Sequence, residues 1–284
     1  MKIAADYFQK GLGKSLGFLV GALVLGTSFP HLVKSLTDDL PWKTVIYTTS
    51  FLALAGGIIL VITVPDGPYR KVGKKFNFSA FFTVFRIRAF RAAAYGYFGH
   101  MWELYAFWTF IPFLLQSFGA LHDTNFNLPL WSFIIIAVGG ISCGLGGVLS
   151  ERFSPKLIAS FALSISGICC LLSPVFLIQP FPEVFLAFLL IWGLSITADS
   201  PMFSTLVAQN SPETSRGTAL TIVNCVGFAI TIVSIQALSL LSQEMNPKYL
   251  FLILAPGPIF GLITMIKLRF IKPKLSEKEL YFYN

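Results

Sequence analysis

The sequence predicts an all-α membrane protein, a polytopic helical bundle of about eight transmembrane helices. Three observations lead to this class: 55% of the 284 residues are hydrophobic, only 12% are charged, and the apolar residues gather in long runs. An ordinary soluble domain carries about 25% charged residues. Because so little of the surface can be polar, most of the exterior must face lipid rather than water.

Eight apolar stretches, separated by polar or turn-forming breaks, are long enough to cross a bilayer. A helix needs about 20 mostly apolar residues for this, since each residue advances the chain by about 1.5 Å. The expected spans are residues 15–36, 44–64, 93–118, 131–150, 157–178, 184–208, 218–241 and 249–269. A short basic segment before the first span could mimic a signal peptide, but the further spans behind it favour a retained helix.

The longest loop, residues 65–92, mixes cations with phenylalanines. Its basic residues are Arg70, Lys71, Lys74, Lys75, Arg86, Arg88 and Arg91, and its aromatic residues are Phe76, Phe78, Phe81, Phe82 and Phe85. This mixture suits an amphipathic segment on the inner leaflet, with its cations near anionic lipid headgroups. A connector that merely carries the positive charge of a cytoplasmic loop is the alternative.

The third span, residues 93–118, carries two polar side chains near the middle of the membrane. Glu103 lies about ten residues into the span, hence about 15 Å deep. A charged group at that depth costs about 2.5 to 3.5 kcal/mol, so it should face protein or a water-filled cavity. His100 lies on the same helix face and could form a hydrogen-bonded pair with Glu103 that changes protonation. A purely structural pair would have the same pattern.

The sixth span, residues 184–208, combines a carboxylate with a helix-breaking residue. Asp199 lies near mid-depth, and Pro201 follows it closely. Because proline lacks a backbone donor, it frees a carbonyl group and favours a kink. The combination suits a gate or a cation site, and an aspartate that only stabilises the kink is an equal alternative.

The other spans offer fewer candidates for chemistry. Asn224 and Gln236 lie in the span at 218–241, where isolated amides usually hydrogen-bond across the bundle; Asn224 is the better candidate for a transport role. The four cysteines show neither CxxC spacing nor a nearby histidine cluster, so we expect no metal site and no cofactor. Glycines spaced by four, which predict close helix packing, are Gly13, Gly17 and Gly21, Gly140 and Gly144, and Gly257 and Gly261.

The positions of Lys and Arg set the expected orientation. Cytoplasmic loops carry an excess of these residues, and 18 of the 21 lie at the two termini and in alternate loops. We therefore expect a multi-pass protein of the inner membrane of the cell, with both termini cytoplasmic. This topology accounts for the net charge of +8, so no nucleic-acid partner is expected.

Two segments resemble the major facilitator superfamily of transporters. Residues 147–156 resemble the loop between the second and third helices of each half in that family, on the positions Gly147, Glu151, Arg152 and Lys156. Arg216-Gly217 matches the arginine-glycine turn before its eleventh helix. The resemblance implies that the 147–156 loop latches helices during alternating access. A solvated loop that only satisfies the charge rule is the alternative.

The resemblance covers nearly the whole chain and implies a partial major facilitator fold. In its register Met1 falls near the end of the fourth helix, so the chain corresponds to the fifth to twelfth helices of an N-terminally truncated member. The stretch at 97–108 also resembles carriers grouped with nitrate or cyanate transport. The implied domains are the last two helices of the N-terminal bundle (1–64), a basic amphipathic cytoplasmic linker (65–92), a six-helix C-terminal bundle (93–270) and a cytoplasmic tail (271–284).

The implied function is secondary active transport of a small solute, with proton coupling through a buried carboxylate. The residues expected on the substrate or proton pathway are His100, Glu103, Asp199 and Asn224. Only the seventh and tenth of the four helices prominent in the family's cavity would remain, so a non-transporting membrane remnant or assembly subunit is the alternative. No HExxH or phosphate-loop pattern is present, so an enzyme is not expected.

Overall fold

The computed structural model describes residues 7–8, 11–37, 40–69, 84–212 and 215–267. Within them, eight helical segments are long and apolar enough to span a membrane, which confirms the predicted multi-pass membrane fold. The first five are α2 (Leu12–Leu36), α3 (Lys43–Thr63), α5 (Arg88–His122), α6 (Leu128–Leu149) and α7 (Pro155–Ile178). The sixth consists of α8 (Pro182–Ala198) and α9 (Ser200–Gln209), and the seventh is α10 (Arg216–Leu241). The eighth contains α11 (Pro247–Leu250), η2 (Phe251–Leu254) and α12 (Pro256–Lys267).

Most helices begin a few residues before the apolar run that predicted them, because their first turns are built from capping residues and proline. The side chains of Asn127, Ser154 and Asn246 cap α6, α7 and α11 by accepting a backbone N–H. Proline in the first turn of each of these helices loses no hydrogen bond, since the first N–H groups have no partner within the helix. The apolar pattern alone does not reveal these turns.

The predicted linker at 65–92 lies only partly within the described residues. Residues 70–83, with Arg70, Lys71, Lys74 and Lys75, fall outside them, as does the predicted tail at 271–284. The helix α5 already begins at Arg88, so the last part of the expected linker is the first turn of a spanning helix. At the other end of this segment, the hydroxyl group of Tyr7 donates a hydrogen bond to the carbonyl of Pro65.

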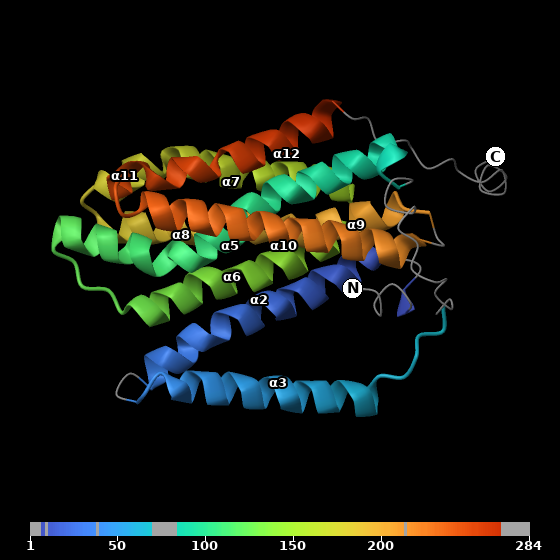
Figure 1. The fold of residues 1–284 in the computed structure, drawn as a ribbon, viewed down its shortest axis with the longest axis horizontal. Coiled ribbons are helices and arrows are strands. Elements are labelled where there is room, and N and C mark those ends of the chain that lie inside the picture. Colours follow the sequence, from blue (N-terminus) through green and yellow to red (C-terminus); the bar gives the residue numbers. More distant parts are fainter. Residues whose placement is uncertain (1–6, 9–10, 38–39, 70–83, 213–214, 268–284) are drawn as a thin grey trace.

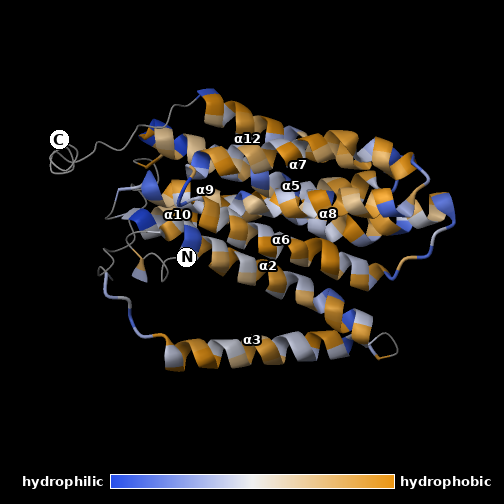
Figure 2. Cartoon of the chain, turned by 180° about the vertical axis from the view of Figure 1, so that it is seen from behind, coloured by the Kyte–Doolittle hydropathy of each residue, from blue (hydrophilic) through white to orange (hydrophobic). Residues whose placement is uncertain are grey.

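The helices run along the long axis of the molecule, and α5 occupies the middle of the bundle (Figure 1). It packs against α10 and α12, α6 packs between α2 and α8, and α7 packs against α8 and α12. The helix α3 contacts α2 at one end and then diverges from it, and none of its residues is buried. Hydrophobic residues dominate the middle of the helices, and hydrophilic residues are more frequent towards their ends (Figure 2).

Glycines allow two pairs of helices to touch through their backbones. A Cβ atom on Gly17 of α2 would lie 2.8 Å from the Cα atom of Gly147 on α6, which is closer than real side chains permit. In the same way, a Cβ atom on Gly99 of α5 would lie 2.3 Å from the carbonyl oxygen of Gly257 on α12. The glycine spacings therefore mark close crossings, as in other membrane bundles. Gly144 is not part of such a close crossing, because a Cβ atom there would only make ordinary contact with Phe18.

Candidate functional site

The functional candidates in the middle of the membrane are His100, Glu103 and Asp199, here called the acid–base cluster. All three side chains are completely buried, although none of them is apolar. His100 and Glu103 lie in the middle of α5, and Asp199 is the residue between α8 and α9. Two carboxylates and an imidazole buried this deeply require compensation by hydrogen bonds, ion pairs or bound protons.

Glu103 is held by three hydrogen-bond donors from two other helices. The indole Nε1 of Trp192 donates to Oε1 at 2.7 Å, and the thiol of Cys170 donates to the same oxygen at 3.2 Å. The hydroxyl of Ser166 donates to Oε2 at 3.0 Å. Within the described part of the chain, Glu103 forms no ion pair, so only neutral donors stabilise a negative charge there.

The expected pair of His100 with Glu103 is wrong. His100 pairs instead with Asp199, and the distance from its Nδ1 to Oδ1 of Asp199 is 2.9 Å. The two residues of α5 share a broad face, but residues three apart still differ in direction by about 60°, as follows from 3.6 residues per turn. Glu103 therefore points towards α7 and α8, whereas His100 lies near the rings of Tyr97 and Phe203. Among the described residues, Nε2 of His100 has no hydrogen-bond partner.

The helix break at Asp199 is stabilised from α6. Pro201 has no backbone N–H to offer to the carbonyl of Thr197, which would be its partner in a continuous helix. The thiol of Cys143 donates to that carbonyl at 3.1 Å, and the hydroxyl groups of Ser142 and Thr197 lie 3.0 Å apart. The carbonyl group that Pro201 leaves free is thus used by a neighbouring helix rather than exposed to a cavity.

Asn224 lies half-buried on α10, on the helix that covers one side of α5. One turn later in α10, Gly227 packs closely on Tyr97 and Met101 of α5. Gln236 is exposed near the other end of the same helix. Of the two amides, Asn224 is therefore the half-buried one, and it lies one turn from a contact with the helix that carries His100 and Glu103.

The 147–156 loop lies against the start of α2. The Nζ atom of Lys14 lies 3.8 Å from Oε1 of Glu151, and the two side chains are each 46% exposed. Gly147 permits this approach, since a Cβ atom there would meet the carbonyl oxygen of Gly13 at 3.1 Å. Arg152 is exposed in the turn, and Lys156 lies half-buried in the first turn of α7. Glu151 of this loop therefore pairs with Lys14, a contact that sequence reasoning missed, and the latch itself stays a prediction.

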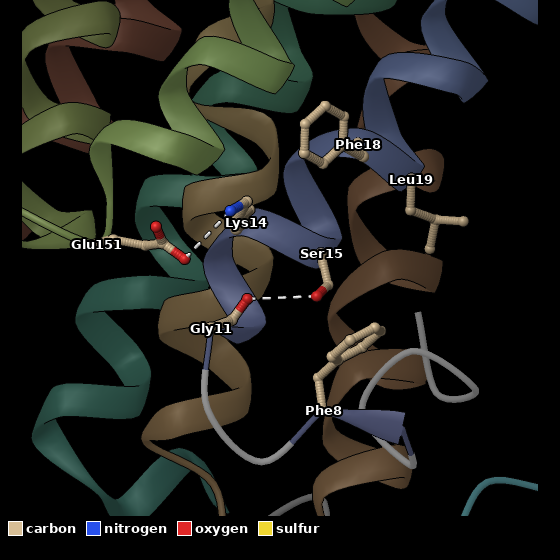
Figure 3. A pocket seen from close by; sticks show the side chains of 7 residues that line it. All are labelled: Phe8, Gly11, Lys14, Ser15, Phe18, Leu19 and Glu151. Atoms are coloured by element: carbon tan, nitrogen blue, oxygen red, sulfur yellow. Dashed lines mark hydrogen bonds and ion pairs between the residues drawn. The ribbon is translucent and has the colours of Figure 1, made fainter.

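An open cavity of about 680 Å³ adjoins this ion pair (Figure 3). Its walls combine the apolar side chains of Phe8, Phe18 and Leu19 with Lys14 and Glu151. It lies where α2 begins, and none of its lining residues belongs to the acid–base cluster. In the described structure this cavity therefore offers no path to Glu103.

The three donors around Glu103 were also missed from the sequence. Ser166 and Cys170 lie four residues apart, so they share one face of α7, and Trp192 lies on α8. The only signal in the sequence was the spacing of Ser166 and Cys170, which places two weakly polar side chains on one face of an apolar helix. Nothing in the sequence indicates that this face meets Glu103.

The chain matches one protein family in sequence and resembles a solved transporter in fold. The family model of the Major Facilitator Superfamily matches residues 1–234 and 93–280. A variant of the E. coli fucose:proton symporter FucP has 17% sequence identity and a TM-score of 0.56, over 83% of this chain and 56% of the symporter. FucP in its outward conformation gives 17% identity and a TM-score of 0.57 over the same shares. No curated protein matches the sequence significantly. The chain thus spans little more than half the length of these solved transporters.

Proposed function

Because this multi-pass membrane chain belongs to the major facilitator superfamily, we propose that it is a secondary active transporter of a small solute, driven by protons and working through alternating access. The family match supports a membrane transporter rather than an enzyme. The observation that carries proton coupling is Glu103, a completely buried carboxylate that has three neutral donors and no ion pair within the described residues. Such a group can bind and release a proton within a bundle.

Two further features support alternating access. The Lys14 and Glu151 ion pair joins α2, from the proposed N-terminal bundle at 1–64, to the loop at 147–156 in the proposed C-terminal bundle at 93–270. The break at Asp199 gives the sixth span a point at which it can bend. In many transporters, solute and ion sites lie beside such interrupted helices near the midplane. We place Asn224 beside this proposed pathway.

The proposed setting is the inner membrane, with both termini cytoplasmic and the linker at 65–92 near anionic headgroups. Positive charges at one end of the bundle support this orientation. Described examples lie near the starts of α2, α5 and α10 and between α6 and α7, and are Lys14, Arg88, Arg216 and Arg152. These helix ends lie together at the end of the bundle where α2 begins (Figure 1). The tail at 271–284 would then share this side.

The solute itself must be found by screening. A thermal-shift screen of the purified full chain should include nitrate and cyanate, because of the resemblance at 97–108, and L-fucose, because the solved neighbours are fucose:proton symporters. The binder is then tested in proteoliposomes that contain a pH-sensitive dye. Addition of a transported solute should move protons across the membrane.

Glu103→Gln should abolish this proton flux while the protein still elutes as a folded species. Glu183→Gln is the matched control, since Glu183 is an exposed glutamate in the first turn of α8. Unchanged flux in Glu103→Gln would remove Glu103 from the mechanism. Loss of flux in both variants would point to a general defect.

A second candidate is a membrane remnant or assembly subunit that does not transport alone. It is favoured by α3, none of whose residues is buried against the rest of the described bundle. Sequencing of the DNA upstream of the Met1 codon distinguishes the two candidates. A region that encodes four further apolar spans would favour a carrier. A chain that binds none of the screened solutes and moves no protons in proteoliposomes would favour the subunit.

A further inference from the structure

The two carboxylate oxygens of Glu103 have different surroundings. Oε1 accepts hydrogen bonds from Trp192 and Cys170, at 2.7 and 3.2 Å. Oε2 meets only the hydroxyl of Ser166, at 3.0 Å. Trp192 can only donate, whereas a serine hydroxyl donates one hydrogen bond and accepts up to two. Oε2 is therefore the oxygen that can carry a proton, because its neighbour can also act as an acceptor.

Ser166 has a second acceptor within reach. Its Oγ lies 3.2 Å from the carbonyl oxygen of Leu163, three residues earlier in α7. The 3.0 Å contact with Glu103 is at the upper limit of the normal range for an O–H···O hydrogen bond, and the 3.2 Å contact with Leu163 is slightly longer. The hydroxyl proton can therefore point to Glu103 or to Leu163 by rotation about a single bond, while the heavy atoms stay in place.

We propose that Ser166 is a positioning residue that allows Glu103 to bind and release a proton at Oε2 without leaving an unsatisfied group. In the ionised state, the hydroxyl of Ser166 donates to Oε2. In the protonated state, the O–H of Glu103 donates to Oγ of Ser166, and the hydroxyl proton of Ser166 turns to Leu163. One proton is added to Oε2, and no other covalent bond forms or breaks. Trp192 and Cys170 stay on Oε1 in both states.

This inference rests on the proton coupling proposed above, and it depends on the charges that surround Glu103. The titratable neighbours are His100 on the same helix, Cys169 and Cys170 on α7, and Asp199 at the α8 to α9 break. His100 is paired with Asp199 and not with Glu103. A proton on Oε2 therefore changes the net charge of the site without a cation having to leave.

The same helix provides a matched control. Ser173 is also buried, and its hydroxyl donates to the carbonyl of Cys170, three residues earlier, at 2.8 Å. Ser166 and Ser173 thus make the same kind of backbone contact, but only Ser166 meets a carboxylate. Any effect of a lost buried hydroxyl on folding should appear in both alanine variants.

The test is an infrared pH titration of the full chain reconstituted in lipid. The carbonyl band of a protonated carboxylic acid is assigned to Glu103 by its absence in Glu103→Gln. In Ser166→Ala the band should reach half its height at a higher pH, by up to about one unit, which is about tenfold in proton binding. The ionised form loses a charge-assisted hydrogen bond, whereas the protonated form loses a weaker neutral one. The band should also move to higher frequency, because the acid O–H has lost its acceptor.

Ser173→Ala should titrate as the unmodified chain does. If Ser166→Ala does not fold, Ser166→Cys keeps a weaker donor and acceptor and should give a smaller shift in the same direction. A half-height equal to that of the unmodified chain in the Ser166 variant would overturn the proposal, as would a Glu103 band that does not change with pH. The titration needs no solute, so a normal titration without proton flux would count against transport and not against Ser166.

Discussion

His100 and Asp199 join α5 to the break between α8 and α9, with Nδ1 and Oδ1 2.9 Å apart and both side chains completely buried. Removal of one member should leave the other buried without its partner, at a cost of about 3 to 5 kcal/mol in the free energy of unfolding. His100→Gln and Asp199→Asn should each destabilise the chain, and the double variant should cost less than their sum. Thermal unfolding in detergent measures all three. Additive losses would show that the pair is not coupled.

Glu103 should be replaceable by an amide but not by an apolar side chain. Glu103→Gln can still accept from Trp192, whereas Glu103→Leu leaves the indole N–H buried without an acceptor. An unsatisfied buried donor costs about 1 to 3 kcal/mol, so the leucine variant should unfold more easily than the glutamine variant by about that amount. Tryptophan fluorescence during unfolding provides the measurement. Equal stabilities would mean that Trp192 finds another partner or needs none.

The crossing of α2 and α6 should not tolerate even one added methyl group. In Gly17→Ala the new Cβ would lie 2.7 Å from the carbonyl oxygen of Cys143, so we expect a loss of about 1 to 3 kcal/mol from overpacking. Gly26→Ala is the control on the same helix, because nothing lies within 4 Å of its Cβ position. That variant should be neutral or more stable by up to about 1 kcal/mol. Comparable melting temperatures in both variants would argue against the backbone contact.

The Lys14 and Glu151 pair should affect transport rate more than stability. Both side chains are partly exposed, so loss of the pair should change the free energy of unfolding by less than about 1 kcal/mol. Lys14→Glu should slow proton flux by placing two acids together, and the double exchange Lys14→Glu with Glu151→Lys should restore it. High salt should weaken both effects through screening. A double exchange that stays slow would argue against a direct role of the pair.

The proposed orientation can be tested with reporter fusions. Both ends of the chain are expected in the cytoplasm, because Lys and Arg gather in the loops on that side. A C-terminal fluorescent protein should therefore be bright, and a C-terminal alkaline phosphatase should be inactive. An N-terminal fusion should give the same answer. Opposite results at the two ends would require an odd number of spans.

The sequence predicted those features that depend on neighbouring residues. The spans follow from runs of about 20 apolar residues, and the break at Asp199 lies next to Pro201, which lacks a backbone donor. The partners of Glu103 could not be predicted in this way, since Ser166 and Trp192 are far away in sequence and meet it only through packing. The pairing of His100 was mispredicted because spacing on one helix does not reveal which neighbouring helix each side chain faces.

Cys143 touches two parts of the protein that would otherwise be separate. Its carbonyl oxygen abuts the α2 crossing at Gly17, and its thiol holds the carbonyl of Thr197, two residues before Asp199. One residue of α6 therefore contacts both α2 and the broken helix. The packing of α2 and the pair of His100 with Asp199 are thus connected through a short stretch of α6.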